Sequence, residues 1–238
     1  MIEPNQRMKT ALLTICMVLT TIIVPAQLQE GLALKYVVQM PGEKSLKIPV
    51  IILLHGYGSN EMDLFGLKDA FPKNYLVISA RAPYPVGSQG YQWFEIGNHE
   101  GKSEQLTNSR KLVLKFISQI VEKYKADAGE VYLMGFSQGA MMSYEVGLTN
   151  PDKLKGIGVL SGRIFPLLRP EIKNTPALKQ LKIFISHGTV DDRIPFAKGK
   201  ESYEYLKTLG LKPDFHEYPG MGHSISNAVL MDLARWLR

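Results

Sequence analysis

Residues 131–146 read VYLMGFSQGAMMSYEV, a pattern that predicts a strand, a tight turn and a helix in succession. An apolar run leads into G-F-S-Q-G at residues 135–139, and a helix-like pattern follows. A G-x-S-x-G turn between a strand and a helix is typical of a nucleophile elbow, which exposes the serine hydroxyl. The following helix directs free backbone N–H groups at the point where an oxyanion would form. Ser137 is therefore a candidate nucleophile, although this pattern alone is equally compatible with an ordinary turn.

A nucleophilic serine needs a base, and His223 has the expected position. Residues 218–224 read YPGMGHS, which predicts a tight loop after the last strand and before a helix over residues 225–238. His223 is the one histidine in this chain that combines a late position with such a loop. The others fit structural turns or surface positions: His55, His187, His216 and His99.

The acid should follow the strand expected over residues 183–186, where the sequence continues as HGTVDDRIP over residues 187–195. A buried carboxylate at Asp191 or Asp192 would accept the Nδ1 proton of His223 and stabilise the imidazolium form. Alternatively, one aspartate opens a turn or caps the next helix. The chain order Ser, Asp, His is the α/β-hydrolase order.

A second oxyanion donor is expected after an early core strand. Residues 48–54 read IPVIILL and lead into HGYGSN at residues 55–60. The backbone N–H groups of Tyr57 and Gln138 would form an oxyanion hole. A glycine-rich turn could also suggest a phosphate loop, but the chain has neither G-x-x-x-x-G-K-[ST] nor G-x-G-x-x-G before a helix. We therefore expect no nucleotide site.

Four blocks together resemble the phospholipase/carboxylesterase family, which includes bacterial carboxylesterases and acyl-protein thioesterases. They are LHGYG at residues 54–58, GFSQG at 135–139, HGTVD at 187–191 and GH at 222–223.

The resemblance covers about residues 35–238 and implies a cofactor-free hydrolase of carboxylic esters or thioesters with the α/β-hydrolase fold. It favours Asp191 over Asp192 as the acid, because Asp191 occupies the last position of HGxxD. Residues 91–94, YQWF, resemble a region where aromatic residues border the acyl site. The resemblance therefore implies that Trp93 binds substrate, with a place in the core as the alternative.

The chain alternates strand and helix patterns, which predicts one α/β domain over residues 27–238. Its 238 residues, 45% hydrophobic, suit a single large core. We expect a mostly parallel central sheet, helices on both faces and little or no lid. The irregular residues 161–180 either border the active site or form a surface loop. The expected strands cover residues 34–38, 50–54, 76–80, 131–134, 156–160, 183–186 and 214–218, and the expected helices cover residues 103–125, 140–148, 196–209 and 225–238.

Residues 1–26 have the pattern of a secretory signal peptide. Basic residues precede an apolar run over residues 11–24, and Val24 and Ala26 fit the small-residue requirement of a signal peptidase. The run is shorter than the roughly 20 residues that span a bilayer. The lone cysteine, Cys16, lies in this run, so a processed chain would have neither a disulfide nor a thiol nucleophile. We expect export to the periplasm or the extracellular medium.

The charge pattern argues against several other classes of partner. The net charge is +6 and the isoelectric point about 9.2, but the basic residues are scattered and form no nucleic-acid-binding module. The chain has no H-E-x-x-H and no C-x-x-C, so we expect no metal and no cofactor. The expected partner is a small acyl ester or thioester, and an acyl thioesterase or a lysophospholipase is the alternative to a carboxylesterase. A peptidase is less favoured because an amine is a poor leaving group, and the complete triad argues against a non-catalytic binding protein.

Overall fold

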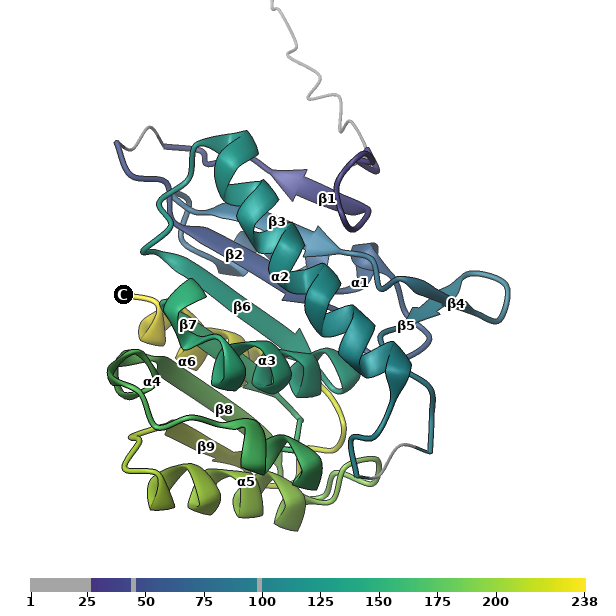
Figure 1. The fold of residues 1–238 in the computed structure, drawn as a ribbon, viewed down its shortest axis with the longest axis vertical. Coiled ribbons are helices and arrows are strands. Elements are labelled where there is room, and N and C mark those ends of the chain that lie inside the picture. Colours follow the sequence, from purple (N-terminus) through teal and green to yellow (C-terminus); the bar gives the residue numbers. More distant parts are fainter. Residues whose placement is uncertain (1–26, 44–45, 98–99) are drawn as a thin grey trace, which may run out of the picture.

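The computed structural model describes residues 27–43, 46–97 and 100–238 (Figure 1). The signal peptide expected over residues 1–26 and the loop histidine His99 lie outside the described residues. In the described part of the chain, the main sheet has seven strands in the order β1-β3-β2-β6-β7-β8-β9. β1 pairs antiparallel with β3, and the other neighbours pair in parallel. The strands are β1 (Tyr36–Gln39), β2 (Val50–Leu54), β3 (Leu76–Ala80), β6 (Val131–Phe136), β7 (Gly156–Leu160), β8 (Lys182–Gly188) and β9 (Asp214–Tyr218).

The central strands are buried on both faces, which explains their continuous apolar sequences. β2 reads VIILL and β3 reads LVISA, and every residue of both strands is buried. Parallel strands between two helical layers typically have such runs. Successive side chains point to opposite faces, so Ile52 and Ile78 enter one core while Ile51 and Val77 enter the other. Each face of the sheet therefore needs a covering layer.

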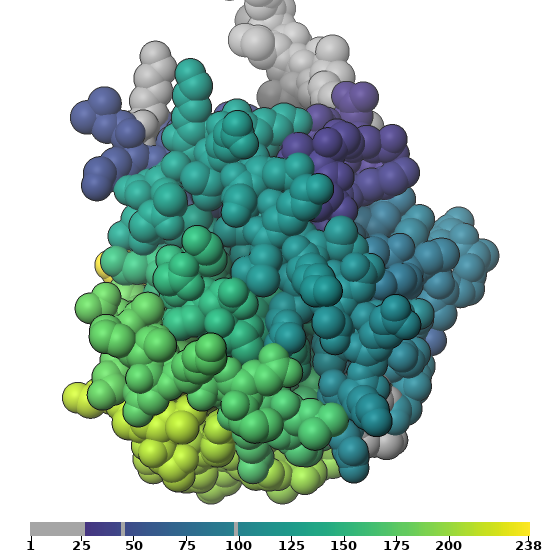
Figure 2. Space-filling model, viewed as in Figure 1, coloured from purple at the N-terminus to yellow at the C-terminus, as the bar shows by residue number. Residues whose placement is uncertain are grey.

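Helices supply both layers. α2, α3, α4 and α5 cover one face, and α1 and α6 cover the other (Figure 1). Figure 2 shows the first face, where the side chains of these helices close over the sheet. Val113, Phe116 and Ile120 of α2 recur at helical spacing and are fully buried. The helices are α1 (Glu61–Phe65), α2 (Glu104–Tyr124), α3 (Gln138–Thr149), α4 (Pro176–Gln180), α5 (Phe196–Thr208) and α6 (Asn227–Trp236), with 3₁₀ helices at Lys68–Ala70, Pro151–Lys153 and Pro166–Glu171.

Polar side chains set the starts of several helices. Ser103, Thr175 and Ser226 each accept a hydrogen bond from a backbone N–H in the first turn of α2, α4 and α6. The Ser226 cap makes α6 begin at Asn227, two residues later than the apolar pattern indicates. α2 ends where Lys125 adopts a left-handed conformation with φ of 51°.

The predicted fold class, a mostly parallel α/β sheet flanked by helices, is confirmed, and β2, β3, β7 and β9 have the predicted bounds. The sequence pattern did not predict α1, α4 or the hairpin of β4 (Tyr84–Val86) and β5 (Gly90–Gln92). An isolated bridge between Ser59 and Tyr91 joins this hairpin to the loop after β2. Within the ranges that the structure describes, no helix combines the length and apolar character needed to cross a bilayer.

Candidate active site

Ser137 lies in the turn between β6 and α3, in a backbone conformation that is rare for a residue with a side chain. Its φ and ψ are 55° and −113°. Such a conformation costs on the order of 1–3 kcal/mol and persists only where the surroundings enforce it. The Ser137 N–H donates to the carbonyl of Leu160 in β7 at 2.9 Å, and the Ser137 carbonyl accepts from Met141 N–H at 3.2 Å. The turn is therefore held by a neighbouring strand and by its own helix.

The two glycines of the G-x-S-x-G motif are needed for close packing. A methyl group at Gly135 would collide with the backbone of Gly139, and one at Gly139 would collide with the carbonyl of Leu54. The start of α3 therefore packs closely against the end of β2. Both glycine positions of the motif have a steric reason in this fold.

The structure brings Ser137, His223 and Asp191 into one hydrogen-bonded chain. Ser137 Oγ lies 2.8 Å from His223 Nε2, and His223 Nδ1 lies 2.8 Å from Asp191 Oδ2. A carboxylate only accepts hydrogen bonds, so Nδ1 carries the proton and Nε2 is free to accept one from the serine hydroxyl. This is the tautomer that a general base needs.

Asp191 is buried, and its other oxygen is also occupied. Its Oδ1 accepts from the backbone N–H groups of Arg193 at 2.9 Å and Ile194 at 2.8 Å. Burial alone would raise the pKa of Asp191, but the hydrogen bonds from His223 and from these two N–H groups outweigh it and hold the pKa below its ordinary value. Asp192 is exposed at the rim of the cleft, so the geometry favours Asp191 as the acid.

The loop that carries Asp191 (residues 189–191, the acid loop) and the loop that carries His223 (residues 218–223, the base loop) are joined by hydrogen bonds from backbone N–H groups. Thr189 N–H donates to the carbonyl of Tyr218 at 3.1 Å, and Val190 N–H donates to that of Met221 at 3.2 Å. The Thr189 hydroxyl in turn accepts from Gly220 N–H at 3.0 Å. These bonds fix the residues before Asp191 against those before His223.

The residues expected to form an oxyanion hole lie on two sides of Ser137. Gln138 is the first residue of α3, where backbone N–H groups have no partner within the helix. A carbon atom added at Gly56 would lie 3.5 Å from Ser137 Cβ, so the loop after β2 passes directly beside the serine. Tyr57 follows in this loop and lines the cleft above Ser137.

Trp93 does not face this cleft, so the prediction that it binds substrate is wrong and the core alternative holds. Its side chain is completely buried. The indole N–H donates to the carbonyl of His55 at 2.9 Å, so the Trp93 ring lies beneath the loop after β2. The next residue, Phe94, lines the cleft instead.

The cleft above Ser137 has a volume of about 1130 Å³ and an apolar lining with a charged rim. This volume suits a small organic ligand. Part of the segment 163–166 contributes to its wall, so the expectation that residues 161–180 border the site is confirmed for this part. The sequence indicated Phe94, Arg163 and Phe165 only as members of the ranges 91–94 and 161–180, and it did not indicate Met141 or Ile194 as lining residues. The helical position of Met141, one turn after Ser137, was the available signal for one of these residues.

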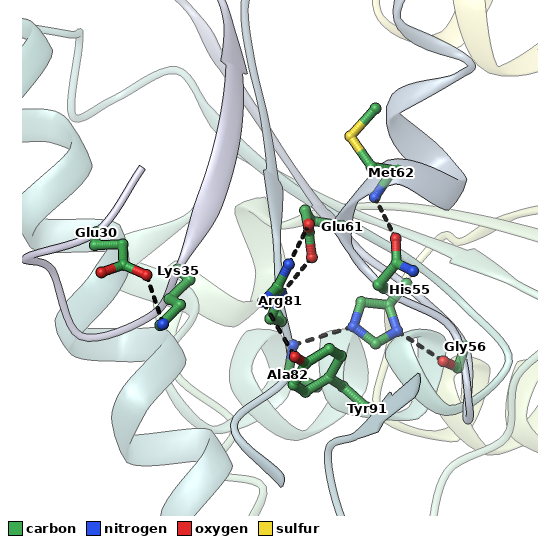
Figure 3. Close-up of polar contacts among 10 residues, drawn as sticks. Glu30, Lys35, His55, Gly56, Glu61, Met62, Arg81, Ala82 and Tyr91 are labelled. Carbon is green, nitrogen blue, oxygen red and sulfur yellow. Dashed lines mark hydrogen bonds and ion pairs between the residues drawn. The ribbon is translucent and has the colours of Figure 1, made fainter. Parts of the chain in front are cut away.

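His55 is a structural residue beneath the loop after β2. Its Nδ1 donates to the carbonyl of Gly56 at 2.7 Å, and its Nε2 accepts from Ala82 N–H at 3.1 Å (Figure 3). Burial lowers the pKa of His55, so the ring is neutral. Beside it, Arg81 Nη2 donates to Glu61 at 2.6 Å, and Arg81 Nη1 donates to the Tyr91 hydroxyl at 3.1 Å (Figure 3).

The remaining described histidines also have structural surroundings. His187 Nε2 donates to the carbonyl of Ile194 at 2.8 Å, and burial lowers the pKa of His187. His216 lies 3.0 Å from Asp214 near the sheet edge. Among the residues whose placement is described, no group of three or more His, Cys, Asp or Glu side chains could hold a metal ion.

A strained serine between strand and helix, a Ser-Asp-His chain order and a mostly parallel sheet define a serine hydrolase of the α/β-hydrolase class. The sequence profile described as Phospholipase/Carboxylesterase matches residues 35–238. The chain belongs to the phospholipase/carboxylesterase family and is a hydrolase that acts on esters.

Two curated relatives and one solved structure illustrate this similarity. Carboxylesterase SOBER1 of Arabidopsis thaliana is 30% identical over 203 residues, covering 79% of this chain and 89% of that protein. Acyl-protein thioesterase 1 of Debaryomyces hansenii is 31% identical over 182 residues, covering 72% of this chain and 78% of that protein. The crystal structure of Arabidopsis SOBER1 matches with a TM-score of 0.69 at 27% identity, covering 79% of this chain and 97% of that chain.

Proposed function

We propose that the protein hydrolyses carboxylic esters through an acyl-enzyme formed on Ser137, with His223 as general base and acid and Asp191 as the group that orients it. The observation that carries the proposal is the unbroken chain of 2.8 Å contacts from Ser137 Oγ through His223 to Asp191. This chain opens into an apolar cleft large enough for an acyl group.

In the first half-reaction, His223 Nε2 takes the hydroxyl proton while Ser137 Oγ attacks the carbonyl carbon. The resulting oxyanion accepts hydrogen bonds from the N–H groups of Tyr57 and Gln138. The C–O bond to the leaving group then breaks, and His223 delivers the proton to the departing alcohol. In the second half-reaction, water loses a proton to His223 and attacks the acyl carbon, so the acid is released and Ser137 regains its proton.

The apolar side chains of the cleft support an acyl group of some length as the bound part. Phe94, Met141 and Phe165 all line it, and the rings of Phe94 and Phe165 lie 5.6 Å apart in an edge-to-face arrangement. A thioester is the second candidate substrate. A relative at 31% identity is named acyl-protein thioesterase, and an oxyanion hole does not distinguish an oxygen from a sulfur leaving group.

The test is hydrolysis of p-nitrophenyl esters from acetate to palmitate, with matched thioesters, by wild type, Ser137→Ala and Ser118→Ala. Ser118 is an exposed serine on α2, so its variant controls for loss of a hydroxyl. We expect Ser137→Ala to lose a factor on the order of 10⁴ or more in turnover, while Ser118→Ala keeps wild-type activity. Ester turnover by Ser137→Ala close to that of wild type would refute the nucleophile.

We also propose that residues 1–26 direct export and are removed, on the sequence pattern of basic residues, a short apolar run and Val24-Pro25-Ala26. Mass spectrometry of the periplasmic or extracellular fraction should find a chain that begins near Gln27. A cytoplasmic protein that keeps residues 11–24 would contradict export.

A further inference from the structure

The Gln138 side chain is buried and uses both ends of its carboxamide. Its Oε1 accepts from Trp93 N–H at 2.7 Å, and its Nε2 donates to the carbonyl of Phe94 at 2.7 Å. One side chain therefore pairs with two successive backbone groups of the segment after β5. Glutamine suits this position because its carboxamide both accepts and donates, whereas a carboxylate only accepts.

The same segment is tied to the loop after β2 by the Trp93 side chain. The indole N–H donates to the carbonyl of His55 at 2.9 Å, and the two rings lie 5.6 Å apart. The Ser109 hydroxyl of α2 donates to the Trp93 carbonyl at 2.6 Å. Because these groups are fully enclosed, each lost bond would leave a buried polar group unpaired.

Tyr57 stands between two anchored neighbours. On one side, the His55 carbonyl is held by the Trp93 indole. On the other side, Gly58 N–H donates to the carbonyl of Tyr91 at 2.9 Å, and Tyr91 N–H donates to that of Ser59 at 2.8 Å. The segment from Tyr91 to Trp93 thus holds the loop on both sides of Tyr57.

The loop after β2 is also held by side chains on the side that faces away from the cleft. The His55 ring bridges Gly56 and Ala82, and Arg81 pairs with Glu61 at the start of α1 (Figure 3). The loop is therefore fixed on its lower side as well. The side chains of Trp93 and Gln138 form a bridge that links it to the start of α3 through the segment after β5.

We propose that the Trp93 indole and the Gln138 carboxamide are positioning groups that set the separation of the Tyr57 and Gln138 N–H groups, which lie on different elements. This inference rests on the proposed function, because it assumes that these two N–H groups bind the oxyanion. Gln138 would then have two roles. Its backbone N–H would bind the oxyanion, and its side chain would hold the segment that positions the loop of Tyr57.

Loss of the hydrogen bonds made by the Trp93 and Gln138 side chains should reduce stabilisation of the transition state more than it reduces substrate binding, because the oxyanion forms only when the serine attacks. Removing one donor outright costs about 10²–10³ in kcat. Misplacing a donor that is still present should cost part of this, so we expect a roughly 10- to 100-fold loss for Gln138→Met and roughly a 10-fold loss for Trp93→Phe.

The matched controls make the same chemical changes elsewhere. Gln119→Met removes a carboxamide that accepts from Ala33 N–H at 2.7 Å, far from the cleft along α2. Trp236→Phe changes an indole that packs against Tyr132 in the core of the other face. Both controls should lower the unfolding temperature without changing kcat more than about 3-fold.

The experiment measures kcat, KM, the unfolding temperature and the inhibition constant of an acyl trifluoromethyl ketone, whose adduct with a serine bears an oxyanion. For Gln138→Met and Trp93→Phe we expect kcat to fall at nearly constant KM, and the ketone to bind weaker by the same factor as kcat. Folded variants with wild-type kcat, a loss confined to KM, or equal losses in the controls would each overturn the positioning role. Failure of the proposed function is distinguishable, because wild type and Ser137→Ala would then turn over the ester equally.

Discussion

Replacing Asp191 with asparagine should remove most of the activity while preserving the fold. Asp191 Oδ1 accepts from the N–H groups of Arg193 and Ile194, and an amide oxygen can take the same place. The amide NH₂ then lies where Oδ2 now accepts from His223 Nδ1 at 2.8 Å. To avoid facing two donors, His223 must move its proton to Nε2, which leaves no acceptor for the Ser137 hydroxyl.

The expected loss in kcat is on the order of 10⁴, equivalent to about 5.5 kcal/mol of transition-state stabilisation. This magnitude is that of the same substitution in a serine protease of another fold, so the measurement tests whether the tautomer argument also applies in this family. The matched control is Asp192→Asn at the next position, where the exposed carboxylate should be replaceable with only a few-fold change. The assay is kcat on one p-nitrophenyl ester at one pH, with thermal unfolding to verify folding. A crippled Asp192→Asn beside an active Asp191→Asn would refute the reasoning.

Two further predictions concern stability. Burial raises the pKa of Glu145 to about 7, with Arg110 opposing this and Glu171 adding to it. Protonated Glu145 therefore contributes its full stabilisation below its ordinary pKa of 4.5, and this contribution is lost as the pH rises through about 7. Glu145→Gln should remove this pH-dependent loss, which amounts to up to roughly 3 kcal/mol of the free energy of unfolding. If the free energy of unfolding changed equally with pH in wild type and variant between about pH 5 and pH 8, the prediction would be contradicted. Gly139→Ala should destabilise the fold by about 3 kcal/mol or more because its methyl would overlap the Leu54 carbonyl, whereas Gly42→Ala, whose methyl has room, serves as the control in thermal unfolding.

The strands could be predicted because burial on both faces requires continuous apolar runs. Residues 50–54 and 156–160 are buried at every position, so their sequences show no polar face and their ends are clear. The hairpin of β4 and β5 was missed because its strands have three residues each and contain Pro85. The hairpin also contacts the loop after β2 through the bridge between Ser59 and Tyr91, a contact between distant parts of the chain that short sequence patterns do not show.

Chain order narrowed the acid to Asp191 or Asp192, between which the HGxxD block favoured Asp191. Ser137 and His223 could be placed from chain order because each follows a recognisable strand in a short loop. Trp93 could not, because a run of adjacent aromatic residues does not indicate which side chain faces the cleft. Trp93 and Phe94 lie in a bend after β5, where no strand periodicity sets the direction of a side chain. Trp93 donates to the His55 carbonyl beneath the loop after β2, while Phe94 lines the cleft. Arg163 and Phe165 come from an irregular segment with no periodic pattern to orient them.

The backbone bonds between the acid loop and the base loop have a consequence for local opening. Residues 189–191 and 218–223 cannot separate without breaking the bonds from Thr189, Val190 and Gly220 together. They should therefore open as one cooperative unit, whose amide hydrogens exchange with solvent at a shared rate. Ser137 is held by a different strand and helix, so a movement of this unit as a whole, with the bonds between its two loops intact, would lengthen the serine–histidine contact while the histidine and its carboxylate stay paired.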